Sequence, residues 1–372
     1  MLISVSFVVK TCNSKPVFQL QKHGRRPYAK MKSLHKSFIL GVIALFSSAV
    51  RISALDVTTT SNHQNRRQAL SAIASTSLLT LQPQASSAIT SVNVPSVNLS
   101  TASSLPSKPF PLASFGLQVY DNDAAYKLTT TALKAGYRNF FASVLAGNQK
   151  GFAQAIRDSN IPRDELYICG SVLSNRARGY ADAFAKTEKG CLENLNIMNK
   201  NSNGKIEYLD MIMLDYPCTD VEGIKGQWDA FIKFMDEKSV VHLAVSNFSP
   251  SQLDVCIERG AVPTVNQLPF SIANHPKGMI EENVKRNIHV QSWSPLSSTL
   301  PRYKGVLAEV GKKYDKSAAQ VGLRWIVQSG GSYCVQSQKE SHFGQDIDVF
   351  DFELSSKDMD LLSGLQPPVL LG

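Results

Sequence analysis

The stretch YLDMIMLDYPCTDVEGIKGQWDAFIKFMDEKSVVHLAVSNF, residues 208–248, has the pattern of a strand, a helix and a second strand. Its ends, 208–215 and 240–248, are short runs of β-branched and other apolar residues, which favour buried strands. Between them, apolar residues recur at helical spacing from Ile224 to Asp236. This order predicts a βαβ unit, in which the two strands are parallel.

The same alternation continues on both sides of this unit. If the short segment near residue 116 is counted, the alternation gives eight strands in about 260 residues. This number fits a closed (β/α)8 TIM barrel better than an open sheet. The alternative α/β fold is a doubly wound sheet, but no G-x-G-x-x-G follows an early strand. The other expected strands are 114–118, 138–143, 165–170, 263–270, 288–295 and 332–338, and the other expected helices are 151–158, 180–197, 250–259, 277–286 and 317–328.

A polar insert, MNKNSNGKIE, occupies residues 198–207 between an expected helix and an expected strand. Its composition predicts a solvated, exposed loop without a functional role.

The charge of the chain is unevenly distributed. The 372 residues are 43% hydrophobic and 19% charged, enough to bury a full core, and the net charge is +9. Residues 1–88 contain eleven Lys and Arg against one acid, Asp56, so the remaining residues carry a charge of −1. The basic excess therefore belongs to the N-terminal segment and does not indicate nucleic-acid binding by the barrel.

That N-terminal segment resembles a layered targeting leader. From Met31 a basic start precedes an apolar run at 38–46, in the form of a secretory signal peptide, so residues 1–30 can lie upstream of the true start. The run is too short to span a bilayer core of about 30 Å. After a transit-like region, Arg66 and Arg67 open a second apolar run that ends at 86–88, resembling a thylakoid-transfer signal.

These features predict entry into a plastid of secondary origin and then the thylakoid lumen, with the plastid stroma as the alternative destination. A thylakoid protein is a candidate partner, and we expect no transmembrane segment in the mature chain. A low-complexity N-terminus with two accidental apolar runs is the alternative explanation. The expected organisation is a targeting leader at 1–88, a Pro/Ser-rich linker at 89–111 and a barrel at 112–368.

The cysteines do not form a metal-binding or redox motif. None lies in a C-x-x-C pattern, and an odd number remains once the leader is removed, which disfavours a complete disulfide framework. Three of them lie at or just beyond the C-terminal ends of expected strands, where buried inert thiols are the favoured interpretation and a thiol cluster at the mouth is the alternative. The six are Cys12, Cys191 and Cys256, with Cys169, Cys218 and Cys334 near strand ends.

Ordered segments resemble the motifs of the aldo-keto reductase family across nearly all of residues 110–368. GYRNF and GNQKGFAQAI resemble GYRHIDTA-x-x-YGNE-x-x-x-G-x-AI, RDELYICGSV resembles R-x-ELFITTKL, and YLDMIMLDYP resembles Y-x-DLYLIHWP. The resemblance implies a (β/α)8 barrel and an NADP(H)-dependent oxidoreductase domain that acts on a carbonyl group. Further segments that match are LAVSNFS (243–249), PTVNQ (263–267), HVQSWSPLSS (289–298), KSAAQVGLRWIVQSG (316–330) and VFDFELSSKDM (349–359).

The catalytic positions of the family are all replaced in this chain. Family members use a Tyr that protonates the substrate oxygen as hydride arrives from the nicotinamide, an Asp and a Lys that tune this Tyr, and a His that orients the carbonyl. Phe141 stands at the Asp position, Ala146 at the Tyr position, Ser171 at the Lys position and Asp215 at the His position. The resemblance therefore names no catalytic residue.

The replacements remove the usual proton donor. Carbonyl reduction needs a proton or a strong hydrogen-bond donor at the oxygen where charge develops. Phe141 and Ala146 supply neither, and Ser171 is a poor acid. Asp215 can serve only if burial raises its pKa enough to keep it protonated, since a carboxylate repels a developing alkoxide. Tyr216 is expected to point to the opposite side of its strand, and Asp215 has no motif-placed partners for a metal site.

The cofactor positions are better retained at the nicotinamide end. By resemblance, Ser246, Asn247 and Gln267 hold the carboxamide and Trp293 stacks on the ring, with Ser294 and Leu296 completing the SPL segment. The alternative for the polar three is that they bind backbone at the barrel rim, and the alternative for Trp293 is packing.

The phosphate end is changed, which weakens the implied binding of NADP(H). The family's Lys and Arg are lost, which removes charge-assisted hydrogen bonds worth about 1.5–3 kcal/mol each. Lys339 is a candidate replacement cation, and the Ser that replaces a Gly can obstruct the pyrophosphate. The residues concerned are Gln336 at the Lys position, His342 at the Arg position, Gln345 and Asp346 at a Glu-Asn pair, Ser297 at the Gly, and the retained Ser337.

Two hypotheses follow. The first is a catalytically degenerate barrel that serves as a binding or scaffold module, with residual affinity for a nicotinamide nucleotide. The second is an NAD(P)H-dependent oxidoreductase in which Asp215, Tyr216 or a cysteine at the mouth supplies the proton.

Overall fold

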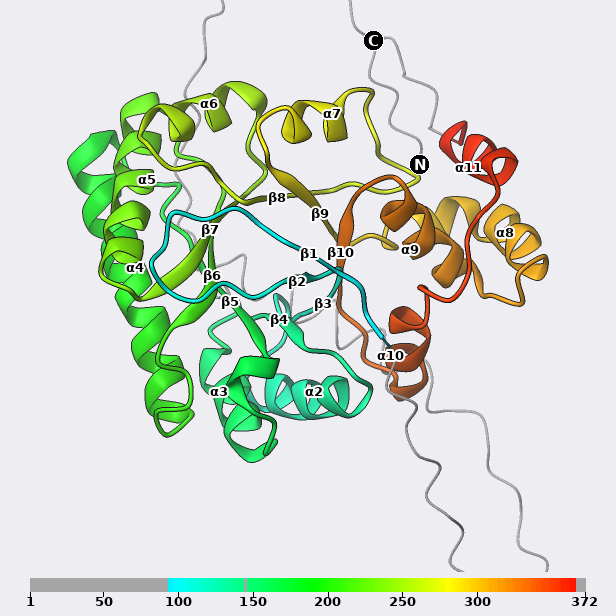
Figure 1. Ribbon diagram of the computed structural model, residues 1–372, viewed down its shortest axis with the longest axis horizontal. Coiled ribbons are helices and arrows are strands. Elements are labelled where there is room, and N and C mark those ends of the chain that lie inside the picture. Colours follow the sequence, from blue (N-terminus) through cyan, green and yellow to red (C-terminus); the bar gives the residue numbers. More distant parts are fainter. Residues whose placement is uncertain (1–92, 144–145, 366–372) are drawn as a thin grey trace, which may run out of the picture. The chain divides into compact units, whose positions relative to one another are not determined.

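Eight parallel strands close into one barrel in the order β10-β3-β4-β5-β6-β7-β8-β9 (Figure 1). The computed structural model describes residues 93–143 and 146–365, which all belong to one compact unit. The closed barrel confirms the (β/α)8 prediction. The strands are β3 (Ala113–Gly116), β4 (Asn139–Phe141), β5 (Tyr167–Val172), β6 (Leu209–Asp215), β7 (Val240–Ser246), β8 (Val265–Leu268), β9 (His289–Trp293) and β10 (Ser332–Val335).

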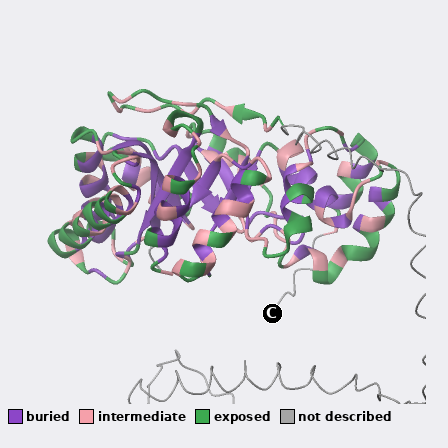
Figure 2. Cartoon of the chain, turned by 90° about the horizontal axis from the view of Figure 1, so that it is seen from below, coloured by how far each residue is buried: buried purple, intermediate pink, exposed green. Residues whose placement is uncertain are grey.

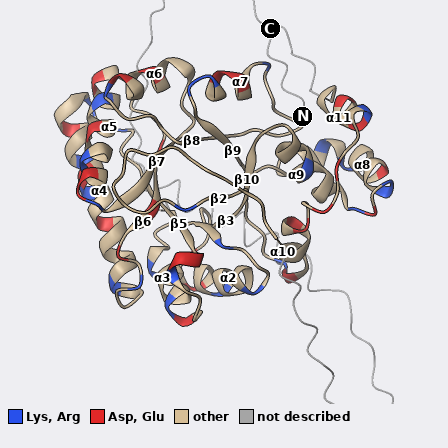
Figure 3. Cartoon of the chain, viewed as in Figure 1, with Lys and Arg blue, Asp and Glu red and all other residues tan. Residues whose placement is uncertain are grey.

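Helices surround the barrel and carry most of its charged side chains, while the strands are buried (Figures 2 and 3). Several helices begin where the sequence supplies a capping side chain: Asp220 caps α5, and Ser317 forms a capping box with Gln320 at α9. The helices are α2 (Asn122–Lys134), α3 (Gln149–Asp158), α4 (Gly179–Asn201), α5 (Val221–Asp236), α6 (Pro250–Glu258), α7 (Met279–Val284), α8 (Thr299–Lys312), α9 (Ala318–Gln328), α10 (Glu340–Ile347) and α11 (Ser356–Ser363).

Side-chain alternation along the strands builds two separate cores. On β6, Met211 and Met213 belong to a small apolar cluster, whereas Ile212 and Leu214 belong to the large one that includes helix residues such as Trp228. Successive strand residues face opposite sides of a sheet. The small cluster therefore fills the barrel interior, and the large one lies between strands and helices.

The insert at 198–207 differs from its prediction. Helix α4 continues to Asn201, and Met198 and Ile206 are fully buried. The Ile206 N–H donates to Ser202 Oγ at 3.0 Å, and Gly204 adopts a positive φ of 81° that allows the chain to turn. The prediction of an exposed loop was wrong because two apolar side chains anchor the segment to the core.

The described part of the predicted linker packs against the barrel. Strand β1 (Ser96–Val97) pairs antiparallel with β2 (Phe110–Pro111), and the segment between them crosses the ring of strands (Figure 1). Ser103 Oγ donates to the Val240 carbonyl at 3.1 Å. Because Val240 begins β7, the segment covers the amino end of the barrel and leaves the carboxyl ends of the strands as the mouth. The predicted leader, 1–88, lies outside the described residues.

A buried carboxylate fixes this cover to the barrel. Asp210 has a side chain only 2% exposed and pairs with Lys108 Nζ at 2.7 Å and Arg163 Nη1 at 2.8 Å. Arg163 also donates to the Tyr208 carbonyl at 2.8 Å and lies over the Tyr208 ring. Two cations around one buried carboxylate offset its desolvation.

Candidate functional site

The carboxyl ends of four adjacent strands bring polar residues into one row. In the strand register, Asp215 of β6 lies beside Ser246 of β7, Ser246 beside Gln267 of β8, and Gln267 beside Gln291 of β9. Parallel strands in a closed barrel end on the same face, which is where such barrels hold their sites. The register therefore gathers three of the predicted site residues at the mouth.

A cavity of about 210 Å³ lies at this mouth, and we call it the mouth cavity. It contains Asp215 and most of the residues predicted for the nicotinamide end, together with Tyr216, which the second hypothesis names as a proton donor, and two residues that the sequence did not indicate, Gln118 and Val119. Gln118 is the last residue of the expected strand 114–118, and this place at a strand end is the signal that could have found it. The predicted lining residues are Asp215, Ser246, Asn247, Gln267, Trp293, Ser294 and Gln336.

Hydrogen bonds hold the row of polar side chains in place. The Trp293 indole N–H donates to Asn247 Oδ1 at 3.1 Å, and Asn247 Nδ2 donates to Ser246 Oγ at 2.8 Å. Gln267 Nε2 donates to Gln291 Oε1 at 2.7 Å. Part of this network matches the rim alternative, since Ser246 Oγ donates to the Gln267 carbonyl at 3.3 Å.

Three residues at the mouth have left-handed backbones directly after a strand. Tyr216, Asn247 and Ser294 have φ of 66°, 63° and 48°. Such values are uncommon for residues with a side chain and persist where the surroundings enforce them. At Tyr216 this turn breaks the strand alternation, so the side chain lines the same cavity as Asp215. The prediction that it points to the opposite side was wrong for this reason.

The four positions that the resemblance aligns with the family's catalytic Asp, Tyr, Lys and His are not equally placed. Phe141 is 2% exposed and belongs to the interior cluster with Tyr167 and Cys169. Ser171 is fully buried and lies two residues after Cys169 on β5, so the two side chains face the same side of that strand. Ala146 is half-buried and lies outside any helix or strand. Of the four, Asp215 alone lines the mouth cavity.

Asp215 is a buried acid without a cationic partner among the described residues. It is 7% exposed, and none of the ion pairs in that part of the chain involves it. Burial raises its pKa to about 6, while a hydrogen bond from Ser171 acts in the opposite direction. Desolvation disfavours the charged form, and a donor to the carboxylate favours it. The carboxyl group therefore changes charge near pH 6.

A second cavity, of about 220 Å³, adjoins the first and is called the β10 cavity here. Both share Ser294 and Gln336. Asp346, 5% exposed, lines this second cavity and accepts a hydrogen bond from Ser337, while burial raises its pKa. The remaining lining residues are Pro295, Leu296, Ser297, Val335 and Ser337.

No cation lines either of these two cavities. The predicted contacts His342 and Gln345 are exposed on α10 and line neither, and the candidate replacement Lys339 is exposed at the start of that helix. Arg302 lines an adjoining hollow of about 410 Å³, which shares Trp293 and Ser294 with the mouth cavity and Ser294 and Ser297 with the β10 cavity.

An amide pair lies where the mouth cavity and the β10 cavity meet, since Gln336 lines both of them and Gln118 lines the mouth cavity. Gln336 Nε2 donates to Gln118 Oε1 at 2.5 Å, and the Tyr120 hydroxyl donates to the Gln336 carbonyl at 2.9 Å. A Cβ at Gly116 would lie 2.4 Å from Gln118 Oε1 and 2.7 Å from Cys334 Sγ. A larger residue at position 116 would therefore displace the Gln118 or Cys334 side chain from its present position.

The five cysteines of the described region are free and buried. Burial raises the pKa of Cys334 to about 12 and that of Cys218 to about 11. A thiol is reactive as the thiolate, so these surroundings favour inert side chains over a thiol cluster. In the same region no group of three His, Cys, Asp or Glu side chains is placed to hold a metal ion.

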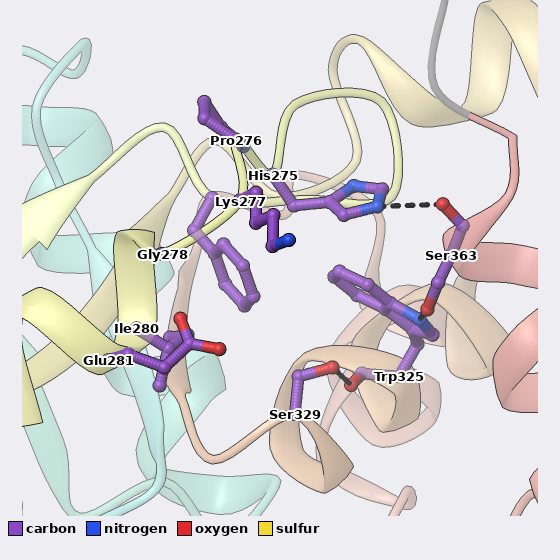
Figure 4. A pocket seen from close by; sticks show the side chains of 10 residues that line it. His275, Pro276, Lys277, Gly278, Ile280, Glu281, Trp325, Ser329 and Ser363 are labelled. Carbon is purple, nitrogen blue, oxygen red and sulfur yellow. Dashed lines mark hydrogen bonds between the residues drawn. The ribbon is translucent and has the colours of Figure 1, made fainter.

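A further hollow, of about 270 Å³, lies beside α9 and holds none of the predicted site residues (Figure 4). His275 Nε2 lies 2.9 Å from the Ser363 carbonyl, and the Trp325 indole N–H donates to Ser363 Oγ at 3.0 Å. These contacts tie α11 to α9 and the loop before α7, which gives the hollow a structural role.

Among residues 93–143 and 146–365, no helix is both long and apolar enough to cross a membrane.

Comparisons with known proteins agree with this geometry. The family model for the aldo/keto reductase family matches residues 112–366. Glyoxal reductase of Bacillus subtilis is 31% identical over 262 residues, covering 69% of this chain and 90% of that protein. The 9,11-endoperoxide prostaglandin H2 reductase of Trypanosoma cruzi is 30% identical over 247 residues, covering 65% and 82%.

A solved structure leads to the same family. The aldo/keto reductase from Brucella melitensis superposes with a TM-score of 0.64 at 27% identity, covering 73% of this chain and 99% of that one. With the eight-stranded closed barrel and the match over residues 112–366, we conclude that the chain belongs to the aldo/keto reductase family.

Proposed function

We propose that this barrel binds a ligand at its mouth and does not reduce carbonyl compounds. The observation that carries the proposal is the environment of Phe141, which stands where the family has an acid. Its ring is buried in the interior cluster beside Cys169 and Met211. Burial of such a ring stabilises the fold by about 1.5–3 kcal/mol, so this position serves packing and offers no proton.

The other replaced positions support the same proposal. Ala146 carries no proton, and the Ser171 hydroxyl is used to hold Asp215. A reductase must place a proton donor at the carbonyl oxygen as charge develops there. Of the four positions that the resemblance aligns with the family's catalytic residues, Asp215 alone combines a titratable proton with access to the mouth cavity.

The residues that line the mouth cavity fit the nicotinamide end of the family's nucleotide but not its phosphate end. Ser246, Asn247 and Gln267 with the ring of Trp293 fit a carboxamide and its aromatic ring, and when bound the cofactor supplies hydride chemistry. The 2′-phosphate does not fit, because Asp346 lines the β10 cavity and no Lys or Arg does. We infer that any nicotinamide nucleotide binds weakly and that the family's preference for the phosphorylated form is lost.

A second candidate function is favoured by the raised pKa of Asp215. At a pKa of about 6, roughly nine-tenths of the carboxyl groups hold a proton at pH 5 and about one-thirtieth at pH 7.5. A protonated Asp215 could donate to a carbonyl oxygen in the mouth cavity. This candidate predicts an oxidoreductase whose rate rises as the pH falls through 6.

Steady-state assays of the full chain separate the two functions. NADPH and NADH oxidation is followed with a panel of aldehydes and ketones at pH 5 and pH 7.5, for the wild type and Asp215→Asn. The binding-module proposal predicts no rate above the protein-free control at either pH. A rate that is larger at pH 5 and absent in Asp215→Asn would establish the second candidate instead.

We further propose that the protein acts in a plastid, in the thylakoid lumen, where a thylakoid protein is its partner. The support is the order of signals in residues 1–88, with Arg66 and Arg67 before the second apolar run. N-terminal sequencing of the native protein tests this: the expected mature end lies near Ala88, and an end well upstream would contradict the lumen assignment.

A further inference from the structure

We propose that the mouth cavity takes a small organic ammonium ion, with Asp215 as its counter-ion and Trp293 and Tyr216 as its aromatic walls. The inference rests on the proposed binding function and names the chemical class of the ligand.

The charge of the cavity is the first argument. Its ten lining residues include one charged side chain, Asp215, and no Lys, Arg or His. That carboxylate is 7% exposed and faces the cavity with Ser171 as its hydrogen-bond partner. A buried carboxylate without a cation is costly, and a ligand that supplies a positive charge offsets that cost. A carboxylate or phosphate ligand would instead be repelled.

The aromatic side chains are the second argument. A cation placed over the face of a Trp or Tyr ring is attracted by the ring's quadrupole. Trp293 and Tyr216 both line the cavity, and the bond from the Trp293 indole to Asn247 Oδ1 fixes the orientation of that ring. Exposed Val119 adds an apolar surface for the carbon atoms of the ligand.

The size of the cavity and its amides limit the ligand. A volume of about 210 Å³ equals the share of roughly seven water molecules at about 30 Å³ each, which suits a short amine. Two of the lining amides, Gln118 and Gln336, are bonded to one another, and Gln267 donates to Gln291. Asp215 is therefore the lining group best able to discriminate a cation from a neutral molecule of the same shape.

The dependence on pH follows from the groups around Asp215. Ser171 and Cys169 face it from β5 and Ser246 lies beside it on β7, with Tyr216 next in the chain. Burial raises the pKa of the Cys169 thiol, so this neighbour stays neutral. Ammonium binding therefore weakens as the pH falls through about 6, where Asp215 takes up its proton.

Calorimetric titration of the full chain at pH 7.5 tests this. The probes are n-propylammonium chloride, its neutral isostere 1-propanol, and sodium propionate, each at the same ionic strength. We expect propylammonium to bind on the order of tenfold or more tightly than either, because it alone pairs with the carboxylate. Potassium chloride is expected to give no binding heat, and an equal response to potassium would overturn the assignment to an organic ammonium ion.

Two variants complete the test. Asp215→Asn keeps the shape and is expected to abolish the preference for propylammonium over propanol, while Asp360→Asn, an exposed acid on α11, leaves it unchanged. Thermal unfolding checks that both variants fold. Equal binding of propylammonium by the wild type and Asp215→Asn would contradict the proposal. If propylammonium does not bind and no carbonyl compound is reduced, only the proposed class of ligand is wrong. If a carbonyl compound is reduced, the proposed binding function itself is wrong.

Discussion

Ser171 and Asp215 lie on adjacent strands at the mouth, and the hydrogen bond from the Ser171 hydroxyl lowers the pKa of the Asp215 carboxyl, which burial raises. Ser171 belongs to β5 and pairs in register with Met213 of β6. Met213 lies two residues before Asp215, so the two side chains face the same side of β6. A neutral hydroxyl thus supports a single acid, and this acid is the one charged side chain that lines the mouth cavity.

The first prediction concerns the pH dependence of stability. The pKa of Asp215 is about 6 in the folded state against 3.8 for a free carboxyl, so the folded state binds more protons. Its contribution to stability is fully present below pH 3.8 and is lost as the pH rises through 6, by roughly 3 kcal/mol at most. Asp215→Asn should therefore gain stability over the wild type between pH 4 and pH 7.5. Urea unfolding at the two pH values measures this difference.

Asp360→Asn, an exposed acid, serves as the control and should show a difference near zero between the two pH values. If Asp215→Asn gained no stability at pH 7.5 relative to pH 4, the carboxyl would not be desolvated as described.

The second prediction concerns cofactor preference. The wild type should bind NADPH no more tightly than NADH, because Asp346 and no cation lines the β10 cavity. Asp346→Asn should strengthen NADPH binding on the order of fivefold and leave NADH almost unchanged, since removal of one nearby negative charge favours the 2′-phosphate. Quenching of tryptophan fluorescence measures both affinities. A wild type that strongly prefers NADPH would show that another cation serves the phosphate.

The third prediction concerns the amino end of the barrel. Arg163→Met should cost about 3–5 kcal/mol in the free energy of unfolding, because it leaves the buried Asp210 carboxylate with the partly exposed Lys108 as its one cation, beside the hydrogen bond from the Ile168 N–H. Lys186→Met breaks an exposed pair with Asp182 and should change stability by about 0.5 kcal/mol or less. Denaturant unfolding of both variants gives the comparison. Equal effects would mean that the Asp210 cluster is no stronger than a surface pair.

The fourth prediction concerns position 141, where the resemblance to the family implies an acid. Phe141→Asp places an unpaired charge in the interior cluster and should destabilise the fold by about 3 kcal/mol or more. Phe141→Leu keeps the position apolar and should cost less than half as much. Thermal and denaturant unfolding distinguish them. A Phe141→Asp variant as stable as Phe141→Leu would show that solvent reaches this position.

Strand and helix periodicity was sufficient to predict the barrel, because buried parallel strands and amphipathic helices differ in their apolar spacing. It failed at residues 198–207, where the polar composition concealed the buried anchors Met198 and Ile206. Two buried residues among polar ones leave no periodic signal. The packing of residues 101–108 on the barrel was missed for a similar reason, since Ser and Thr bond there to backbone carbonyls.

At the mouth, the sequence indicated seven of the lining residues, among them Asp215, Ser246 and Gln267, but not Gln118, Val119 or the direction of the Tyr216 side chain. The left-handed turn at Tyr216 is set by the tertiary structure and reverses the direction that strand alternation predicts. The hydrogen bond between Gln118 and Gln336 joins residues 218 positions apart. Local patterns in a single sequence do not predict contacts between such distant residues.

The most direct test of the central claim is a single-turnover experiment with the full chain in excess over NADPH, or over NADH, at pH 5. A reactive short aldehyde and a ketone are added, and the loss of reduced nucleotide is followed until any one hydride transfer per molecule would be complete. We predict that the nucleotide is oxidised no faster than without protein. Stoichiometric oxidation in the wild type that is lost in Asp215→Asn would contradict the account and establish Asp215 as the proton donor of a working reductase.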